Sequence, residues 1–329
     1  MSRLRFSHLA VGLLLYTLPV VVWGAYVRAS GSGDGCGDHW PSCGGEVVPT
    51  GVEHVKTWIE YSHRASTAIY GILALWLAVW AFRAYPKAHP LRKSAVAVLV
   101  FTVIEGLIGR YLVKHQLVAM DSSTERVVWM ALHLANVFSL LTAVTITAWW
   151  SVGGAHLRAR ENSKMAWLWG ACLVSVIALA VTGSMSALGD TLYPASSLME
   201  GMRQDFAHDA AFILKTRPLH PLMATVVSIF MAWTILATLR QRPSEQIKRF
   251  APIVLMTLAG QYVFGFANLL MLAPIWMQLT HLLLANLLWI GLVVLGACAV
   301  GEELRVLDVE KIDKEKEVRG WSRQVPSAL

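Results

Sequence analysis

The chain has 329 residues, of which 56% are hydrophobic and 15% are charged, and its formal net charge is +7. Soluble domains carry roughly a quarter charged residues, so this composition excludes an ordinary soluble globular protein. The charged residues gather in short islands between long apolar runs, which is typical of a protein that crosses a membrane several times. The basic residues flank these runs, so they indicate orientation in a membrane and not binding to nucleic acid.

Eight apolar runs are each long enough to cross a bilayer, which requires roughly 20 residues. We expect them to be helices, because backbone exposed to lipid has to satisfy its own hydrogen bonds. The alternation of a membrane β-barrel is missing from these runs. The predicted spans are 8–27, 58–82, 94–113, 125–150, 166–187, 216–239, 250–271 and 275–300.

The basic residues between the spans predict the orientation. Thirteen Lys and Arg residues lie at the N-terminus and in 83–93, 151–165 and 240–249, whereas the alternate segments hold five. The richer set is expected on the cytoplasmic side. This predicts a multi-pass protein of the cell inner membrane with both termini in the cytoplasm and the loop 28–57 outside. The last segment, 302–329, is expected to be a charged cytoplasmic tail.

The two halves of the chain resemble each other weakly. "ALHLANVFSLL" in the fourth span matches "LTHLLLANLLW" in the eighth, and aligning Glu105 with Gln261 places Gly109 on Gly265. Corresponding spans run in the same direction, so the repeat is parallel. The sequence therefore predicts an all-α integral membrane protein built from two tandem four-helix bundles, residues 1–150 and 151–301.

Four of the 11 histidines lie inside apolar spans, one in each even-numbered span: His63, His133, His220 and His281. Each follows the outer start of its span by four to eight residues, or roughly 6–12 Å at 1.5 Å per residue. Ionisable residues inside spans are usually functional. Haem iron takes two axial ligands, whereas zinc requires four, or three and a water. We therefore predict two bis-histidine haem sites, His63 with His133 and His220 with His281.

Several charged residues lie close to these histidines. Basic residues near the outer span ends can pair with haem propionates, and we favour the two that flank histidines, Arg64 and Arg217, over the other three: Arg28, Arg110 and Arg126. Snorkelling to the membrane surface is the alternative for each of the five.

Two glutamates also lie within or beside the spans. Glu60 precedes His63 by three residues and shares its helix face, where it can accept protons or hold a water beside a haem, unless it is simply hydrated. Arg217 occupies the matching place in the second half. The two units are therefore alike in their histidines and unlike in their acid chemistry, which predicts that one unit carries out the reaction and the other supports it. Glu105 lies deeper, in the third span, and its carboxyl group is protonated, paired with Arg110 or part of the functional site.

The polar loop "SGSGDGCGDHWPSCGG" carries Cys36 and Cys43. The predicted topology places this loop outside, where disulfides persist. The loop has too few ligands for a closed zinc site. A structural disulfide and a redox-active pair both stay open. The other cysteines, Cys172 and Cys298, lie in apolar spans and are expected to be small core residues.

The segments "VRASGSGDGCGDHWPSC", "EYSHR" and "LHLAN", followed by His220 and His281, together resemble the haem A synthase family over nearly all eight spans. Members of that family oxidise a ring methyl group of haem O to a formyl group, which gives haem A for terminal haem-copper oxidases. Two departures stand out. Pro221 follows His220 where Arg64 follows His63, and the loop between the fifth and sixth spans lacks the second cysteine pair of some relatives.

The resemblance implies roles for the predicted site residues. His63 and His133 would hold the substrate haem O, and His220 and His281 a resident haem b. Glu60 would be the essential acid residue. Cys36 and Cys43 would form a disulfide that takes part in electron or group transfer. Haem O synthase, the terminal oxidase assembly and an electron carrier are the implied partners.

Two other functions compete with this interpretation. A two-haem electron carrier would also use four histidines, but haems stacked across the bilayer are then expected, and all four ligands share the outer half. A repeat-built transporter would place its site near the midplane at broken helices, for which Pro19 and Pro274 are weak signals.

Overall fold

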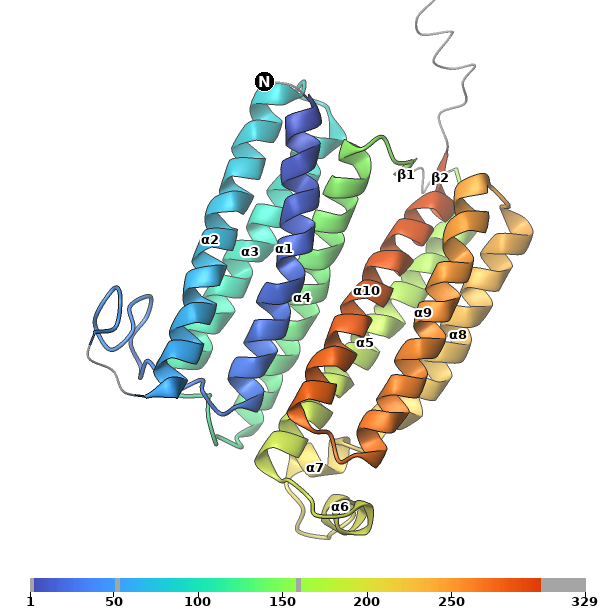
Figure 1. Cartoon of the computed structure of the whole chain (residues 1–329). Coiled ribbons are helices and arrows are strands. Elements are labelled where there is room, and N and C mark those ends of the chain that lie inside the picture. Colours follow the sequence, from blue (N-terminus) through green and yellow to red (C-terminus); the bar gives the residue numbers. More distant parts are fainter. Residues whose placement is uncertain (1–2, 51–53, 158–160, 303–329) are drawn as a thin grey trace, which may run out of the picture.

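The computed structural model describes residues 3–50, 54–157 and 161–302. Nearly all of the predicted charged tail therefore lies outside the described residues. Long helices dominate the structure (Figure 1). The long helices are α1 (Arg3–Ala29), α2 (Val55–Ala84), α3 (Pro90–Lys114), α4 (Thr124–Ser151), α5 (Ser163–Leu192), α8 (Leu219–Gln241), α9 (Glu245–Leu270) and α10 (Ile275–Val300).

Eight helical segments of the described chain are long and apolar enough to cross a membrane, which confirms the predicted number of spans. The sixth of these segments, Phe212–Gln241, consists of the short helix α7 (Phe212–Thr216) followed by α8. Helix α1 continues through Pro19 without a break, which removes one of the signals for a broken-helix transporter. The sequence predicted the span centres well because apolar length is a local property.

Two small features were not predicted. Helix α6 (Leu198–Asp205) lies in the loop after α5, where Ser197 caps it by accepting a hydrogen bond from the Glu200 backbone nitrogen at 3.2 Å. Strand β1 (His156–Leu157) pairs with β2 (Gly301–Glu302) in an antiparallel ladder of two residues each. The two strands of this short ladder are about 145 residues apart in the sequence, so no local sequence pattern predicts their pairing.

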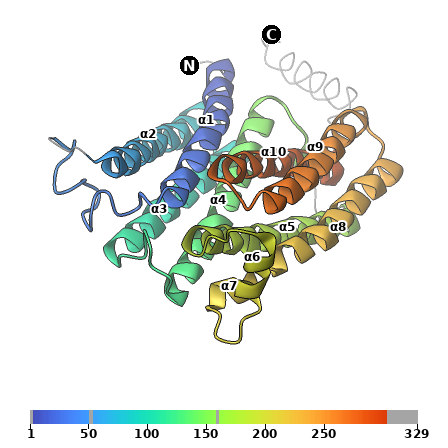
Figure 2. The same cartoon turned by 60° about the horizontal axis from the view of Figure 1, so that its bottom comes forward.

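The long helices form two groups (Figures 1 and 2). Helices α1 to α4 pack against one another, and α5, α8, α9 and α10 form the second group. The groups meet where α4 and α1 contact α10 and α5. Trp289 of α10 is 1% exposed and its Nε1 donates to the Phe138 carbonyl of α4 at 3.0 Å. This buried hydrogen bond links the two helix groups.

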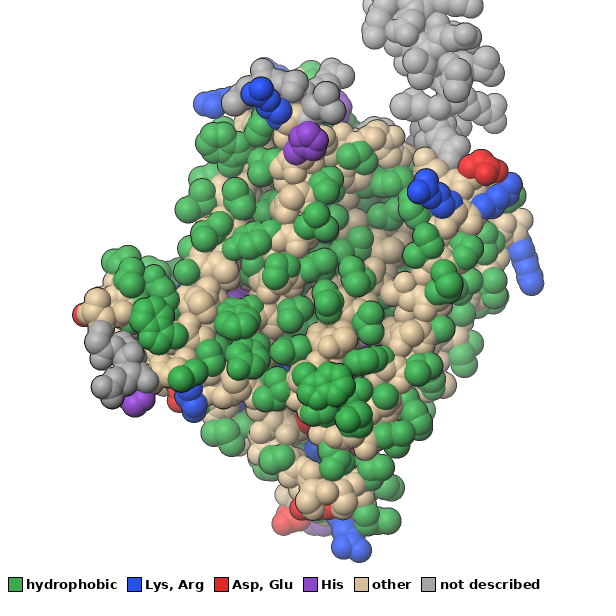
Figure 3. Space-filling view, viewed as in Figure 1, with side chains coloured by type: hydrophobic (Ala, Val, Ile, Leu, Met, Phe, Trp, Pro, Cys, Tyr) green, Lys and Arg blue, Asp and Glu red, His purple; other side chains and the backbone are tan. Residues whose placement is uncertain are grey.

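The outer surface of the helices is apolar along its middle. Figure 3 shows hydrophobic side chains across the middle of one face, with Lys and Arg side chains toward its two ends. Large apolar residues point away from the protein, including Trp167, which is 80% exposed, and Val174, Ile229 and Val263. Apolar surface on this scale is stable only against another apolar phase, so it marks the face that contacts lipid.

Candidate functional site

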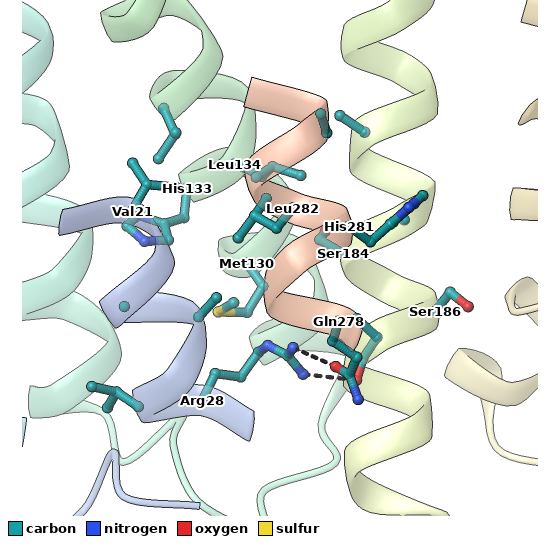
Figure 4. Close-up of a pocket in the computed structure, with 18 of the residues that line it drawn as sticks. Val21, Arg28, Met130, His133, Leu134, Ser184, Ser186, Gln278, His281 and Leu282 are labelled. Atoms are coloured by element: carbon teal, nitrogen blue, oxygen red, sulfur yellow. Dashed lines mark hydrogen bonds between the residues drawn. The ribbon is translucent and has the colours of Figure 1, made fainter. Parts of the chain in front are cut away.

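A large cavity opens between the helices, with a volume of about 1590 Å³. Residues from all eight long helices line it, and most of the lining side chains are apolar. All four predicted histidines are among these residues (Figure 4 labels His133 and His281). Pockets for ordinary small ligands measure roughly 300–1,000 Å³, so this cavity has room for a larger ligand or for more than one.

The first histidine pair lies in the helix group α1 to α4. His63 of α2 and His133 of α4 are close enough to interact electrostatically. The Nδ1 atom of His63 is buried and has no hydrogen-bond partner. His133 Nδ1 instead pairs with the Glu105 carboxylate of α3. An unpartnered buried ring nitrogen is costly, so the first pair is better suited to a bound ligand than to an empty core.

The second pair repeats this arrangement in the other group. His281 of α10 interacts electrostatically with His220 of α8. His220 Nδ1 lies 3.3 Å from the Thr182 hydroxyl of α5, and His281 Nε2 lies 3.3 Å from Gln261 Nε2 of α9. The Nδ1 atom of His281 is buried without a hydrogen-bond partner. Each helix group thus contributes two interacting imidazoles to the cavity.

Glycines allow three of the four imidazoles to lie against a neighbouring helix. A Cβ atom on Gly24 would lie 2.9 Å from His63 Cε1, and one on Gly183 would lie 2.9 Å from His220 Cε1. A Cβ on Gly265 would lie 2.7 Å from His281 Cε1. Real Cβ atoms essentially never approach so closely. Any larger residue at these positions would displace the ring.

The fourth imidazole is supported differently. Gly109, which the sequence aligns with Gly265, has no atom within 4 Å of the Cβ position. His133 pairs with Glu105, whose Oε1 also accepts a hydrogen bond from Asn136 Nδ2 at 2.7 Å. The alternative that Glu105 pairs with Arg110 is wrong, since Glu105 pairs with His133 and the Arg110 guanidinium lies over the ring of Trp40, in the loop between α1 and α2.

A disulfide joins Cys36 to Cys43 in the loop between α1 and α2. The Glu60 carboxylate of α2, only 4% exposed, accepts a hydrogen bond from the Cys36 backbone nitrogen at 2.8 Å. Its other oxygen accepts from Arg64 Nη2 at 2.5 Å. Arg64 Nη1 in turn donates to the carbonyls of His39 at 2.6 Å and Ser42 at 2.8 Å. Glu60 and Arg64 therefore hold the disulfide loop against the N-terminal end of α2.

Two further contacts hold this loop against α2. Thr57 Oγ1 donates to the Gly35 carbonyl at 2.7 Å, and a Cβ on Gly35 would lie 2.5 Å from the Lys56 carbonyl oxygen. Trp40, the next residue after His39, lines the cavity together with Pro41. Only glycine fits at position 35, so the loop can lie close enough to form part of the cavity wall.

The far end of the loop is polar and exposed. The Glu46 carboxylate accepts hydrogen bonds from the Thr50 backbone nitrogen at 2.8 Å and the Thr50 hydroxyl at 2.9 Å. These bonds favour the ionised carboxylate and hold the pKa of Glu46 below its usual value. Glu46 is thus a charged surface group, unlike the buried Glu60.

Arg217, predicted as a propionate partner, is enclosed by acidic residues. Its Nε donates to Asp205 Oδ1 at 2.7 Å, and its Nη1 donates to Asp190 Oδ1 at 3.1 Å. Its Nη2 also donates to the Gly201 carbonyl at 3.2 Å. Neither Asp190 nor Asp205 was predicted from the sequence, although Asp190 lies in the last turn of α5 and Asp205 ends α6 in the loop that follows. Arg64 is similarly paired, with Glu60.

The donors present fit haem better than an isolated metal ion. Within the described ranges, no three His, Cys, Asp or Glu residues form a group that could hold a metal ion. Cys172 and Cys298 are buried and take no part in a disulfide. Two imidazole pairs facing an apolar cavity match the two axial ligands of a haem iron, with a cavity wall suited to the porphyrin ring.

Comparisons with known proteins show which sequences this chain is similar to. The chain is 39% identical over 296 residues to the "Protoheme IX farnesyltransferase" of a Thermus thermophilus strain, which covers 90% of this chain and 48% of that protein. It is 36% identical over 100 residues to the "Heme A synthase" of Alkalihalophilus pseudofirmus, covering 30% of this chain and 32% of that one. The corresponding protein of Geobacillus kaustophilus is 42% identical over 97 residues, 29% and 30% of the two chains.

The chain thus spans about half the length of its Thermus relative and aligns with about a third of the others. A family model, COX15-CtaA, described as a cytochrome oxidase assembly protein, matches residues 7–293. That match covers most of the chain and all four cavity histidines. The protein therefore belongs to the COX15-CtaA family of cytochrome oxidase assembly proteins.

Proposed function

We propose that this protein is a haem A synthase, an enzyme that oxidises a ring methyl group of haem O to a formyl group. The observation that carries the proposal is the pairing of four imidazoles around one large apolar cavity, with the Glu60 and disulfide network beside the first pair. Family membership and the partial matches to proteins named "Heme A synthase" support it.

The two histidine pairs take different roles in this proposal. His63 and His133 hold the substrate haem O, and His220 and His281 hold a resident haem b. The asymmetry between the units supports this division, because Glu60 and the disulfide lie near the first pair, whereas Arg217 is neutralised near the second. A bound haem supplies a redox-active iron whose potential depends on its axial ligands.

The residues around the first pair handle protons and electrons. Converting a methyl group to a formyl group is a four-electron oxidation that also adds one oxygen atom, so with water as the oxygen source it releases protons and electrons that each need an acceptor. The Glu60 carboxylate, held by Arg64 and the Cys36 nitrogen, is the proton acceptor in our proposal. In our proposal the Cys36–Cys43 disulfide is the redox-active pair, because it can accept two electrons and two protons to become two thiols. The whole conversion releases twice that number of electrons, so an electron carrier has to reoxidise the thiols between the two rounds.

The membrane arrangement follows the same proposal. The two helix groups are tandem four-helix units of one parallel repeat in the inner membrane, with both termini in the cytoplasm and the disulfide loop outside. The Thermus relative, named for farnesyl transfer to protohaem IX, is about twice as long as the segment that matches this chain. This supports a supply of haem O by such a transferase and delivery of haem A to terminal oxidase assembly.

The test is a chromatogram of extracted haem. Cells that make haem O are compared with and without this protein, and the purified protein is extracted in parallel. A haem A synthase yields haem A in the cells and haem b in the purified protein. A two-haem electron carrier would yield unmodified haem b alone, and a transporter would yield no bound haem.

A further inference from the structure

A buried arginine lies at the outer end of the cavity near the first histidine pair. Arg126 is in the first turn of α4, is 3% exposed and lines the cavity. Its Nη1 donates to the carbonyls of Ala119 at 2.8 Å and Asp121 at 2.6 Å. Its Nε is buried without a hydrogen-bond partner. The backbone contacts hold the side chain in place, and the Asp121 carboxylate attracts its charge without forming an ion pair with it.

A second arginine, Arg28 in the last turn of α1, lines the same cavity. Its Nη1 donates to the Ala187 carbonyl and the Thr191 hydroxyl of α5, each at 2.7 Å, and its Nη2 donates to Gln278 Oε1 of α10 at 2.9 Å. Figure 4 shows Arg28 reaching across to Gln278 on the same side of the cavity as Met130. All of these partners are uncharged.

The two guanidinium groups are close enough to repel each other electrostatically. Asp190 attracts Arg28, but this carboxylate already pairs with Arg217 at 3.1 Å. Among the described residues, neither Arg28 nor Arg126 has a carboxylate oxygen within 4 Å. A buried charge is costly unless it is paired, so the buried Arg126 beside the half-buried Arg28 favours an anion between them.

The position of this cationic pair suits the carboxylates of a porphyrin. Arg126 precedes His133 by seven residues on α4, or about 10 Å along the helix. Arg28 follows Gly24, which contacts the His63 ring, by four residues, or about 6 Å. The pair therefore lies outward of the first imidazole pair, on the helices that carry or touch those imidazoles.

We propose that Arg28 and Arg126 form the subsite that binds the propionate carboxylates of the porphyrin held by His63 and His133. This deepens the proposed function and rests on it. Arg64 and Arg217, which the sequence favoured for this role, each have a carboxylate partner from the protein. Because Arg28 also contacts α5 and α10, the subsite lies at the junction of the two helix groups.

The experiment is a binding titration of the full-length protein in detergent with haem b and with haem b dimethyl ester, which lacks the two carboxylates. Absorbance reports axial ligation, and the signal lost in His133→Ala is assigned to the first site. The wild-type protein is expected to bind haem b at least tenfold more tightly than the ester. Arg126→Gln and Arg28→Gln should each weaken haem b binding about tenfold and leave ester binding unchanged, as expected for loss of a charge-assisted hydrogen bond.

Arg110→Gln is the matched control, because Arg110 is an exposed arginine near the outer end of α3 that does not line the large cavity. Its ratio of haem b to ester affinity should equal that of the wild type. Arg126→Lys keeps the charge and should retain most of the preference for haem b. This variant and Arg28→Gln decide the matter if Arg126→Gln does not fold.

Two results would overturn the subsite alone. The first is that a wild-type protein that still converts haem O binds haem b and its ester equally tightly. The second is that folded Arg28→Gln and Arg126→Gln variants keep the wild-type ratio of haem b to ester affinity. A wild-type protein that binds neither probe at its histidine pairs would overturn the proposed function together with the subsite.

Discussion

The Glu60 carboxylate accepts a hydrogen bond from the Cys36 backbone nitrogen at 2.8 Å, which joins a helix residue to one half of a disulfide 24 positions earlier. The same carboxylate pairs with Arg64, and Arg64 holds two further carbonyls of the loop. Any movement of the disulfide loop therefore changes the hydrogen bonds of the buried acid beside His63. This coupling links the two groups that we propose handle protons and electrons.

Replacing Glu60 tests its role as proton acceptor. Glu60→Gln keeps the shape of the side chain and can still contact Arg64 weakly, but it cannot take up a proton. General acid–base groups contribute roughly 10²- to 10⁴-fold to rate, so haem A formation should fall at least 100-fold while the resident haem b stays. Haem chromatography measures both. Glu46→Gln, at an exposed carboxylate of the same loop, is the control. Near-normal haem A from Glu60→Gln would remove Glu60 from the mechanism.

The disulfide can be tested with conservative variants. Cys36→Ser and Cys43→Ser should each abolish haem A formation and leave the haem b content unchanged, because the redox-active pair is lost while the helices are untouched. Activity is measured in reducing and in oxidising medium, and Cys298→Ser, at a buried cysteine outside any disulfide, serves as control. If both loop variants stay active in both media, the disulfide is structural and not redox-active.

The division of labour between the histidine pairs predicts opposite phenotypes. His63→Ala and His133→Ala should stop conversion and leave the resident haem b, whereas His220→Ala and His281→Ala should lose haem b. The low-spin absorbance spectrum and the extracted haem report these outcomes. His54→Ala, at an exposed position before α2, is the control. Loss of haem b from the His63 variant would reverse the assignment of the two units.

The glycines beneath the imidazoles provide a matched steric test. Gly183→Ala and Gly265→Ala place a methyl group 2.9 Å and 2.7 Å from the His220 and His281 rings, so both should shift the haem b spectrum or lower its content. Overpacking of this kind costs about 1–3 kcal/mol. Gly109→Ala meets no atom within 4 Å and should leave the spectrum unchanged. Unaltered spectra in all three variants would show that these contacts do not position the rings.

Local sequence patterns predicted much of this molecule. The eight spans follow from runs of apolar residues, and the structure places a long helix over each of them. The pairing of His63 with His133 and of His220 with His281 follows from their matched depth and the internal repeat, and the structure makes the members of each pair neighbours. Both inferences use information that is periodic or local along the chain, which is why they required no knowledge of the packing.

The partners of the charged groups could not be predicted in this way. Arg217 meets Asp205 and Asp190, 12 and 27 residues away, and Arg28 meets Gln278, 250 residues away. These contacts depend on which helix faces turn toward each other, and an apolar span carries little signal about its rotation. The sequence by itself determined the spans and the family, and it predicted the histidine pairs. The tertiary structure alone decided which arginines pair with a carboxylate of the protein and which do not, because charge pairing depends on distance in space.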